Sequence, residues 1–336
     1  MPKPESIPSV IFAASHSIAL PLLDLLHQED VLAQHLRLRG IISQPDRPSG
    51  RGKSSKPTLV AQWALERKIP LHRPEKLDEG TLKWLKQQSC ELLLVMAYGQ
   101  MIGKSIRECP RLGIFNFHAS LLPRFRGATP TEAALASEAA ETGVSLMEIT
   151  AAMDAGDCLG SLSVPIDFFD TQTELTAKLS HAARSLAEQF LPQLLSGTAE
   201  YHPQDSSKVS YCRKLETRDR FLDFHAPAEV LHRRIRALSP RPGCIFELGD
   251  RIYKICSTDV GPSSFCDKEA GTLLSIPPRQ AAIVAGDGKY LFLREIQIPG
   301  GKCMPVTSFL LGHSFPWGSV LPSHPMRALE HPSFPF

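Results

Sequence analysis

The chain has 336 residues, of which 43% are hydrophobic and 21% are charged. A chain of this length typically forms about two domains, and its composition is typical of a soluble globular protein rather than of a disordered chain. It contains no run of about 18 apolar residues, and its first residues lack the pattern of a signal peptide. We therefore expect neither a membrane span nor a secretion leader.

Eight cysteines are scattered along the chain, and no two of them form a Cys-x-x-Cys pair. This spacing argues against a zinc knuckle and against a redox pair. In a chain of this length we expect reduced, mostly structural thiols of the cytosol.

Charge is unevenly distributed along the chain. Residues 207–336 carry 17 basic and 12 acidic side chains, whereas residues 1–206 carry 20 basic and 23 acidic ones. The positive excess of the C-terminal part suggests an anionic partner there, although random surface composition explains it about equally well.

The N-terminal part alternates short apolar runs with segments of helical periodicity. We expect strands over residues 10–13, 38–42, 91–97, 113–118 and 144–149, and helices over residues 18–27, 57–68, 78–88 and 171–195. This alternation predicts an α/β domain with a doubly wound, Rossmann-like parallel sheet and helices on both of its faces.

The pattern changes after residue 197. Residues 198–212 are polar and weakly patterned, which is typical of a linker. We expect a helix over residues 227–238, followed by short strands over residues 244–248, 252–256, 281–284 and 290–293. These elements predict a small β-barrel or sandwich, with domain boundaries at 1–197, 198–212 and 213–336.

Two polar side chains emerge near the end of the expected strand 113–118. Because side chains alternate across a strand, Asn116 and His118 share one face, opposite Phe115 and Phe117. Ligands bind at the carboxyl edge of open α/β sheets, and an amide with an imidazole can stabilise the oxyanion of a tetrahedral centre. Asn116 is also the only asparagine in the chain. A hydrogen-bonded pair that caps the strand is the alternative interpretation.

A third polar group, Asp154, follows the expected strand 144–149 within the sequence Met153-Asp-Ala-Gly-Asp157. Its carboxylate could orient His118 and favour the charged imidazole. Asp and Gly at this spacing are also common in turns, and the spacing by itself favours a simple turn.

A cationic loop is expected over residues 44–56, between a strand and a helix. It carries Arg47, Arg51, Lys53 and Lys56 among Pro, Gly and Ser residues. Arg47 stands where a phosphate-binding P-loop needs glycine, and the third glycine of the dinucleotide fingerprint is missing, so we reject both motifs. The loop is able to grip an RNA or phosphate backbone, or is simply solvated.

Together these motifs resemble a known family. The segments Asn116–Pro123 with Arg126-Gly127, Met153–Asp157 and Gln44–Lys53 are similar to those of the methionyl-tRNA formyltransferases. The wider group of formyltetrahydrofolate-dependent transferases shares the Asn, His and Asp positions, whereas only the tRNA-acting branch carries the Gln44–Lys53 pattern. Similarity extends to Glu141–Val144, Ile235–Pro240 and Phe309–Gly312, so the resemblance covers essentially the whole chain.

The resemblance implies a catalytic domain, a linker and a C-terminal OB-like β-barrel that helps to hold tRNA. The implied reaction transfers formyl from 10-formyltetrahydrofolate to methionyl-initiator-tRNA, without a metal, by a monomer in the bacterial cytoplasm. By resemblance, Asn116, His118 and Asp154 are catalytic. The other implied site residues are Ser120, Leu121, Leu122, Pro123, Tyr98 and Gly99 for folate, and Arg47, Arg51, Lys53, Arg213 and Lys214 for tRNA, with Arg218, Arg233, Arg234 and Arg236 as further backbone contacts.

The chain departs from the family pattern at two positions. Ile18 stands where the family has the phenylalanine of its methionine pocket, and Arg241 stands where the family commonly has tryptophan. Three alternatives stay open. A formyltetrahydrofolate hydrolase needs neither the basic loop nor the basic barrel, and a nucleotide-sugar formyltransferase lacks the Arg51 loop. An inactive RNA-binding module is the third, and the intact Asn116, His118 and Asp154 argue against it.

Overall fold

The computed structural model describes residues 7–28, 32, 34–48, 55–261 and 266–333. The chain divides into two compact units. The first contains Met1–Ala128, Glu141–Pro165 and Thr176–Tyr211, and the second contains Thr129–Ala140, Ile166–Leu175 and Cys212–Phe336. Because the two units alternate along the chain, they do not define a single boundary, and the domain limits at residues 197 and 213 stay a prediction.

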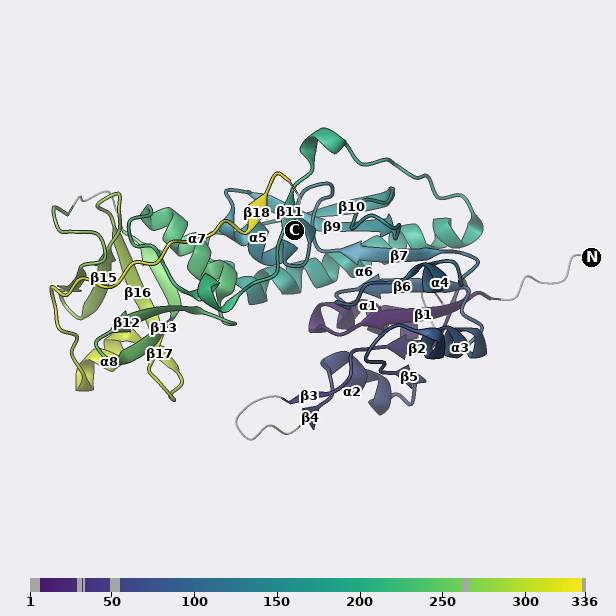
Figure 1. Cartoon of the computed structure of the whole chain (residues 1–336), viewed down its shortest axis with the longest axis horizontal. Helices are drawn as coiled ribbons and strands as arrows, with labels where there is room; N and C mark the ends of the chain where they lie inside the picture. The colour runs from purple at the N-terminus through teal and green to yellow at the C-terminus, as the bar shows by residue number, and fades with distance from the viewer. Residues whose placement is uncertain (1–6, 29–31, 33, 49–54, 262–265, 334–336) are drawn as a thin grey trace, which may run out of the picture. The chain divides into compact units, whose positions relative to one another are not determined.

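The first unit is built on a seven-stranded sheet (Figure 1). Its order is β10 (Cys158–Pro165), β9 (Glu141–Glu148), β7 (Ile114–His118), β6 (Leu92–Met96), β1 (Ser9–Ala14), β2 (Arg37–Ile42) and β5 (Leu71–His72). The strands from β7 to β5 are parallel, and β9 is antiparallel to both of its neighbours, β7 and β10. Every residue of β1 and β6 is buried, so both faces of the sheet are covered at its centre, as in a doubly wound fold.

Two helices of the first unit begin at a side-chain cap. Thr58 Oγ1 accepts a hydrogen bond from the N–H of Ala61 at 3.0 Å, and Asp78 Oδ1 accepts one from the N–H of Gly80 at 2.9 Å. These caps start α2 (Leu59–Glu66) and α3 (Glu79–Gln87). The other helices of this region are η1 (Ser17–Ala19), α1 (Leu20–His27), α4 (Lys104–Arg107), η2 (Ser206–Lys208) and the long α6 (Gln172–Ser196), which follows β10.

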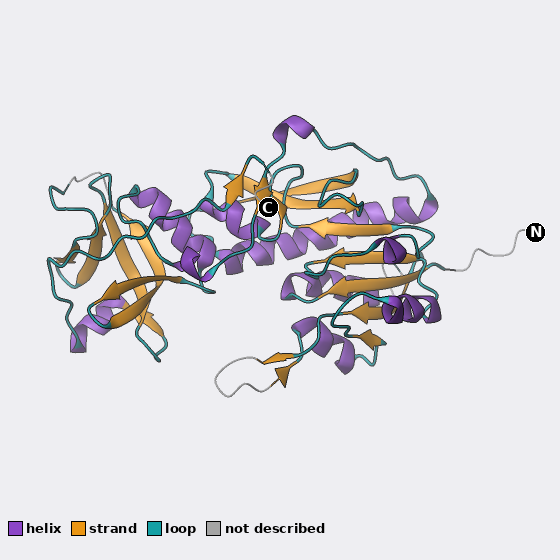
Figure 2. Ribbon diagram, in the orientation of Figure 1, coloured by secondary structure: helices purple, strands orange, loops and turns teal. Residues whose placement is uncertain are grey.

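The second unit holds a curled antiparallel sheet that forms a half-barrel (Figure 2). Its order is β12 (Cys244–Leu248), β13 (Arg251–Val260), β16 (Tyr290–Gln297), β15 (Gln280–Val284) and β14 (Leu273–Ile276), and β17 (Cys303–Pro305) also pairs with β16. Leu231 and Ile235 of α7 (Ala228–Leu238) pack in one core with Phe246 and Ile255. The remaining elements are α5 (Pro130–Ala136), η3 (Thr217–Arg220) and α8 (Val306–Gly312), with the short strands β3 (Arg47–Pro48), β4 (Ser55–Lys56), β8 (Arg126–Gly127), β11 (Tyr211–Cys212) and β18 (Glu330–His331) elsewhere in the chain.

The structure confirms the predicted α/β architecture and differs from the expectation at the sheet edge. The strand expected over residues 144–149 is β9, which runs antiparallel to β7, and the sequence analysis missed its partner β10. A short connection over residues 149–157 joins β9 to β10, and short connections of this kind allow only antiparallel pairing. This hairpin matters for the site, because its connection carries Asp154.

One cysteine pair corrects the expectation of reduced thiols. Cys256 on β13 and Cys303 on β17 form a disulfide, with their Cα atoms 6.5 Å apart. Both strands flank β16, which brings together two residues separated by 47 positions in sequence. The sequence alone could not predict this disulfide, because the two cysteines meet only through the strand pairing of the curled sheet.

Candidate active site

The candidate site lies at the end of β7 in the first unit. β7 pairs with β6 and β9, so Asn116 and His118 lie between two neighbouring strands. Phe115 and Phe117 are buried, while Asn116 is half-buried and His118 is buried. Because the strand spans Ile114–His118, its alternation places Asn116 and His118 on one face, as the sequence predicts.

The two ring nitrogens of His118 have different neighbours. Nε2 lies 2.8 Å from the carbonyl oxygen of Phe125, and because a carbonyl oxygen can only accept, we assign a proton to Nε2. Nδ1 lies 3.7 Å from Oδ2 of Asp154, which is an ion-pair distance but is longer than a hydrogen bond. In the charged imidazole, the Nδ1 proton is therefore available to an oxygen atom of a ligand.

The carboxylate of Asp154 is held in place by the backbone. Its Oδ2 accepts a hydrogen bond from the N–H of Gly127 at 2.7 Å. Asp154 and Phe125 both have left-handed backbones, with φ of 49° and 59°, a region that residues other than glycine rarely adopt. Both residues present an oxygen to the same imidazole, and backbone strain of this kind clusters at functional sites.

Gly156 lets the Asp154 turn approach β9. A Cβ atom at this position would lie 2.0 Å from the carbonyl oxygen of Glu148, so only glycine fits. The Asp-Ala-Gly-Asp sequence is thus both a turn, as its residue types favour, and the segment that carries the carboxylate to His118.

The sequence analysis missed Gln204, which supports this turn. Gln204 Nε2 donates to the carbonyl oxygens of Asp154 at 2.9 Å and of Gly156 at 2.8 Å. Gln204 Oε1 accepts from Nε and Nη2 of Arg126 at 3.1 and 2.7 Å. Gln204 lies in the expected linker, about which composition predicts only polarity, so no signal in the sequence could have found this role.

The turn after β7 contains the predicted folate residues Ser120, Leu121, Leu122 and Pro123. Ser145 of β9 organises it, because its Oγ donates to the carbonyl oxygen of Ser120 at 2.8 Å and accepts from the N–H of Leu122 at 3.0 Å. Ser120 is fully buried and donates to a backbone carbonyl, so it belongs to the framework of the turn. Leu121, Leu122 and Pro123 are half-buried and can line a ligand site.

Tyr98 and Gly99, also predicted for folate, follow the end of β6. The carbonyl oxygen of Tyr98 accepts from Gln44 Nε2 at 2.7 Å and from Ser15 Oγ at 3.5 Å, which joins the segments after β1, β2 and β6. The Tyr98 ring is 3% exposed within an apolar cluster, and burial raises the pKa of its hydroxyl to about 12. This turn can therefore offer backbone atoms to a ligand, but not the Tyr98 ring.

The described ends of the cationic loop pair with each other. β3 and β4 form a short antiparallel ladder in which Arg47 is opposite Lys56. Arg47 is exposed, and its Nη2 lies 3.1 Å from Oε2 of Glu75. The predicted tRNA residues Arg51 and Lys53 lie outside the described residues.

Two comparisons with known sequences identify the family. Residues 9–191 match the formyl transferase family, and residues 214–314 match the formyl transferase C-terminal domain. The methionyl-tRNA formyltransferase of Halorhodospira halophila is 31% identical over 318 residues, which cover 95% of this chain and 99% of that protein. The methionyl-tRNA formyltransferase of Ectopseudomonas mendocina is 36% identical over 292 residues, which cover 87% of this chain and 88% of that protein. The chain belongs to the methionyl-tRNA formyltransferase family.

Solved structures share the fold at lower identity. An N-formyltransferase from Helicobacter canadensis, in complex with folinic acid and dTDP-3-aminofucose, has a TM-score of 0.64 and 16% identity, and the match covers 85% of this chain and 98% of that chain. A sugar 3N-formyl transferase, in the presence of dTDP and 5-N-formyl-THF, has a TM-score of 0.63 and 18% identity, covering 88% of this chain and 99% of that chain. At this level of identity, the likeness establishes the fold alone.

Two arginines that the family resemblance implied for tRNA are structural. The side chains of Arg213 and Asp219 are each 1% exposed, and the Arg213 guanidinium donates to Oδ1 and Oδ2 at 2.6 and 2.7 Å. Arg234 donates to the same carboxylate at 3.0 Å and is 5% exposed. A guanidinium enclosed in this way cannot reach a phosphate, so we correct the predicted role of Arg213 and Arg234.

The other basic residues of the second unit differ in their accessibility. Lys214 and Arg218 are exposed. Arg233 binds Glu138 at 3.1 Å with its side chain 20% exposed, and Arg236 donates to the carbonyl oxygens of Asp167 and Asp170. Of this set, Lys214 and Arg218 are the most available to a polyanion.

The two departures from the family pattern lie in different environments. Ile18 is 5% exposed within η1, so it is packed inside the first unit. Arg241 is exposed in the second unit.

Among the described residues there is neither a metal-binding cluster nor a membrane-spanning helix. No cluster of His, Cys, Asp and Glu among these residues is arranged to hold a metal ion. None of the described helices has the length and apolar character needed to cross a membrane.

Proposed function

We propose that this protein transfers the formyl group of 10-formyltetrahydrofolate to the α-amino group of methionyl-initiator-tRNA, for the initiation of translation. Family membership supports the reaction. The observation that carries the mechanism is the 3.7 Å approach of Asp154 to Nδ1 of His118, on the same strand face as Asn116.

The acceptor needs little activation. An α-amino group titrates at roughly 7.7–8.0, and an adjacent ester lowers this value, so much of the acceptor is neutral near neutral pH. No strong buried base is therefore required before the nitrogen attacks the formyl carbon.

The oxygen of the formyl group gains negative charge during this attack. The Asn116 amide and the Nδ1–H of charged His118 can donate to this oxygen, while the Asp154 carboxylate stabilises the imidazolium. The acceptor nitrogen loses a proton and the leaving nitrogen of the folate gains one, and Asp154 with His118 can relay it through water. Bond breaking then returns the carbonyl group, now on the acceptor nitrogen.

The proposed cellular location follows from the location of the acceptor, initiator tRNA. Initiator tRNA is charged and used where bacterial ribosomes work, so we place the protein in the bacterial cytoplasm. We further propose that it acts as a monomer, in which one chain supplies both the transferase site and the cationic surfaces.

The decisive experiment follows radiolabelled formyl from 10-formyltetrahydrofolate onto methionyl-initiator-tRNA. Free methionine, a nucleotide-linked amino sugar and water serve as competing acceptors. We expect label on the tRNA only. Release of formate in the absence of tRNA would instead indicate a hydrolase, and label on the amino sugar would indicate a sugar formyltransferase.

A further inference from the structure

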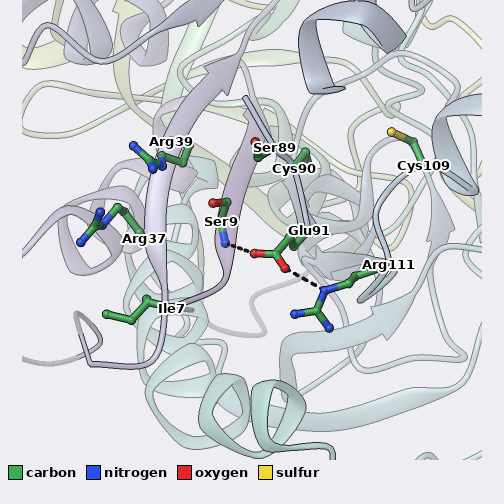
Figure 3. A pocket seen from close by; sticks show the side chains of 9 residues that line it. All are labelled: Ile7, Ser9, Arg37, Arg39, Ser89, Cys90, Glu91, Cys109 and Arg111. Carbon is green, nitrogen blue, oxygen red and sulfur yellow. Dashed lines mark hydrogen bonds and ion pairs between the residues drawn. The ribbon is translucent and has the colours of Figure 1, made fainter. Parts of the chain in front are cut away.

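A cavity at the opposite end of the same strands has no part in the proposed reaction. It has a volume of about 620 Å³ and lies at the amino ends of β1, β2 and β6, whereas Asn116 and His118 lie at the carboxyl end of β7 (Figure 3). Its lining residues are Ile7, Ser9, Arg37, Arg39, Ser89, Cys90, Glu91, Cys109 and Arg111. All of them belong to the first unit.

Two arginines on one side of this cavity are uncompensated. Arg37 and Arg39 are both exposed and lie two residues apart on β2, where the register with β1 shifts between Leu38 and Gly40, and both line the cavity. Within the described part of the chain, neither guanidinium has a hydrogen bond or an ion pair with another residue. β5 pairs only with Ile41 and Ile42 of β2, so this end of β2 is open along one edge.

A third arginine lies on the other side of the cavity, and a glutamate holds it there. Glu91 Oε1 accepts from Arg111 Nε at 2.7 Å, and Oε2 accepts from the N–H of Ser9 at 2.8 Å. Partial burial raises the pKa of Glu91, but these two hydrogen bonds outweigh it and lower the pKa overall. The carboxylate is therefore charged and engaged with Arg111 and Ser9, and the lining of the cavity carries three guanidinium groups and this one carboxylate.

The pairing of the strands sets the distance between the two sides. Arg37 is opposite Ser9, and Ser9 is one residue before the pairing of β1 with β6, level with Glu91. Two strand spacings separate the Arg37 backbone from the Glu91 backbone by about 10 Å. Arg37 and Arg39 therefore line one side of the cavity and Arg111 lines the other, a separation that suits an anion larger than a single phosphate.

A second cavity of about 340 Å³ shares Ser89, Cys90 and Cys109 with the first and adds Lys86. Its glutamate, Glu108, is 3.7 Å from Lys104 and so is already paired. The thiol at the junction is not a nucleophile, because burial raises the pKa of Cys90 to about 12. The two adjoining cavities therefore offer charged groups for binding an ion and not a nucleophile for catalysis.

We propose that this cavity binds a small phosphorylated molecule of the diphosphate class, such as a nucleoside diphosphate or free pyrophosphate. The net positive lining selects an anion, and forked guanidinium groups match phosphate oxygens. The volume of the first cavity lies within the range of small-ligand sites, which is about 300–1,000 Å³. An RNA backbone, by contrast, would need an extended surface.

Calorimetric titration of the full-length protein with pyrophosphate, ADP and orthophosphate tests this proposal. The variants are Arg37→Gln and Arg39→Gln, with Arg184→Gln as the charge-matched control, because Arg184 is a half-buried residue of α6 that lies outside the cavity and is paired with Glu188. We expect pyrophosphate and ADP to bind more tightly than orthophosphate. Each cavity variant should weaken this binding by roughly tenfold, the effect of one charge-assisted hydrogen bond, and the control should not.

Comparison of the probes identifies the source of the phosphate. Tighter binding of ADP than of pyrophosphate indicates that the nucleoside also contributes, whereas equal binding indicates that the diphosphate alone is recognised. A saturating tetrahydrofolate analogue should not compete, because it binds at the other end of the strands. Formyl transfer by Arg37→Gln should stay within about twofold of wild type.

Three results would overturn the proposal. The first is the absence of diphosphate binding to the wild-type protein. The second is equal weakening by the cavity variants and by Arg184→Gln, which would indicate a general effect of charge. The third is binding of an RNA oligonucleotide, sensitive to Arg37, without binding of either diphosphate. None of these results depends on whether the protein transfers formyl groups.

Discussion

At the scale of single residues, the proposed oxyanion donors give the most direct prediction. Asn116→Ala or His118→Ala removes one donor from a preorganised site, so kcat should fall by about 10²–10³ with folate binding nearly intact. Single-turnover transfer and folate titration measure the two quantities separately. A variant that keeps more than about a third of the wild-type rate would show that the residue is not a donor.

Asp154 acts through His118, so its replacement should alter the pH dependence as well as the rate. Asp154→Asn keeps the hydrogen bond from Gly127 but removes the negative charge beside Nδ1. The pH–rate profile should therefore shift as well as fall in height. A lower rate with an unshifted profile would reduce Asp154 to a turn residue.

His232 gives a residue-scale prediction about stability. Burial, together with the charge of Arg236, lowers the pKa of His232 from 6.5 to about 4. As the pH falls, His232 becomes protonated in the unfolded chain before it does so in the folded protein. The contribution of neutral His232 to the free energy of unfolding is therefore complete above pH 6.5 and is lost as the pH falls towards 4. The loss amounts to about 3 kcal/mol over this range.

Urea unfolding of wild type and His232→Gln at several pH values measures this contribution. The variant should show a weaker decrease of the free energy of unfolding between about pH 6.5 and about pH 4. His181→Gln, at an exposed position on α6, is the control and should behave like wild type. If the free energy of unfolding fell equally with pH in all three proteins, His232 would not be the cause of the decrease.

At the scale of elements, one buried carboxylate joins η3 to α7. Burial raises the pKa of Asp219, but hydrogen bonds from Arg213 and from the N–H of Glu216 outweigh it and lower the pKa to about 2. Arg234 of α7 donates to the same group. A carboxylate that satisfies two enclosed guanidinium groups fixes the start of the second unit against its helix.

Asp219→Ala should leave those two guanidinium groups buried without a counter-charge. We expect a loss of about 3–5 kcal/mol in the free energy of unfolding, which denaturant titration measures. Asp223→Ala, which removes an exposed pairing with His225, is the matched control and should cost less than about 1 kcal/mol. Equal effects of the two changes would show that the buried network does not stabilise the unit.

At the scale of the whole molecule, cationic residues lie on both compact units. Arg47 and Lys56 belong to the first unit, and Lys214 and Arg218 belong to the second. Each phosphate that they neutralise contributes about −0.7 to −0.9 to the slope of log K against log salt concentration. Binding of methionyl-tRNA should therefore weaken steeply with salt, whereas binding of folate should change little.

Substitution separates the cations proposed to contact tRNA from the buried Arg213. Arg51→Ala should raise KM for the tRNA and lower kcat, because a misplaced acceptor end reacts poorly. Lys214→Gln should reduce the salt slope by at most about one unit, whereas Arg213→Lys should act mainly on stability. A salt-independent KM for tRNA would contradict the prediction that cationic residues of both units bind the tRNA.

The local periodicity of the sequence determined the secondary structure and the α/β fold of the first unit. The apolar runs of β1 and β6 and the helical periodicity of residues 57–68 and 78–88 act over a few residues, so the α/β fold could be predicted from them. The placement of Asn116 and His118 on one face of a strand was equally predictable, because it follows from the alternation of side chains at positions two residues apart. The family motifs then indicated the chemistry.

Tertiary structure alone decided the rest, because the contacts concerned join residues far apart in the chain. Gln204 reaches the Asp154 turn across 50 positions, and Cys256 meets Cys303 across 47. Arg213 looks like any other basic residue in the sequence, yet Asp219 and Arg234 enclose it. Burial and counter-charge depend on how elements pack, and a sequence pattern records only the residue type that each position carries.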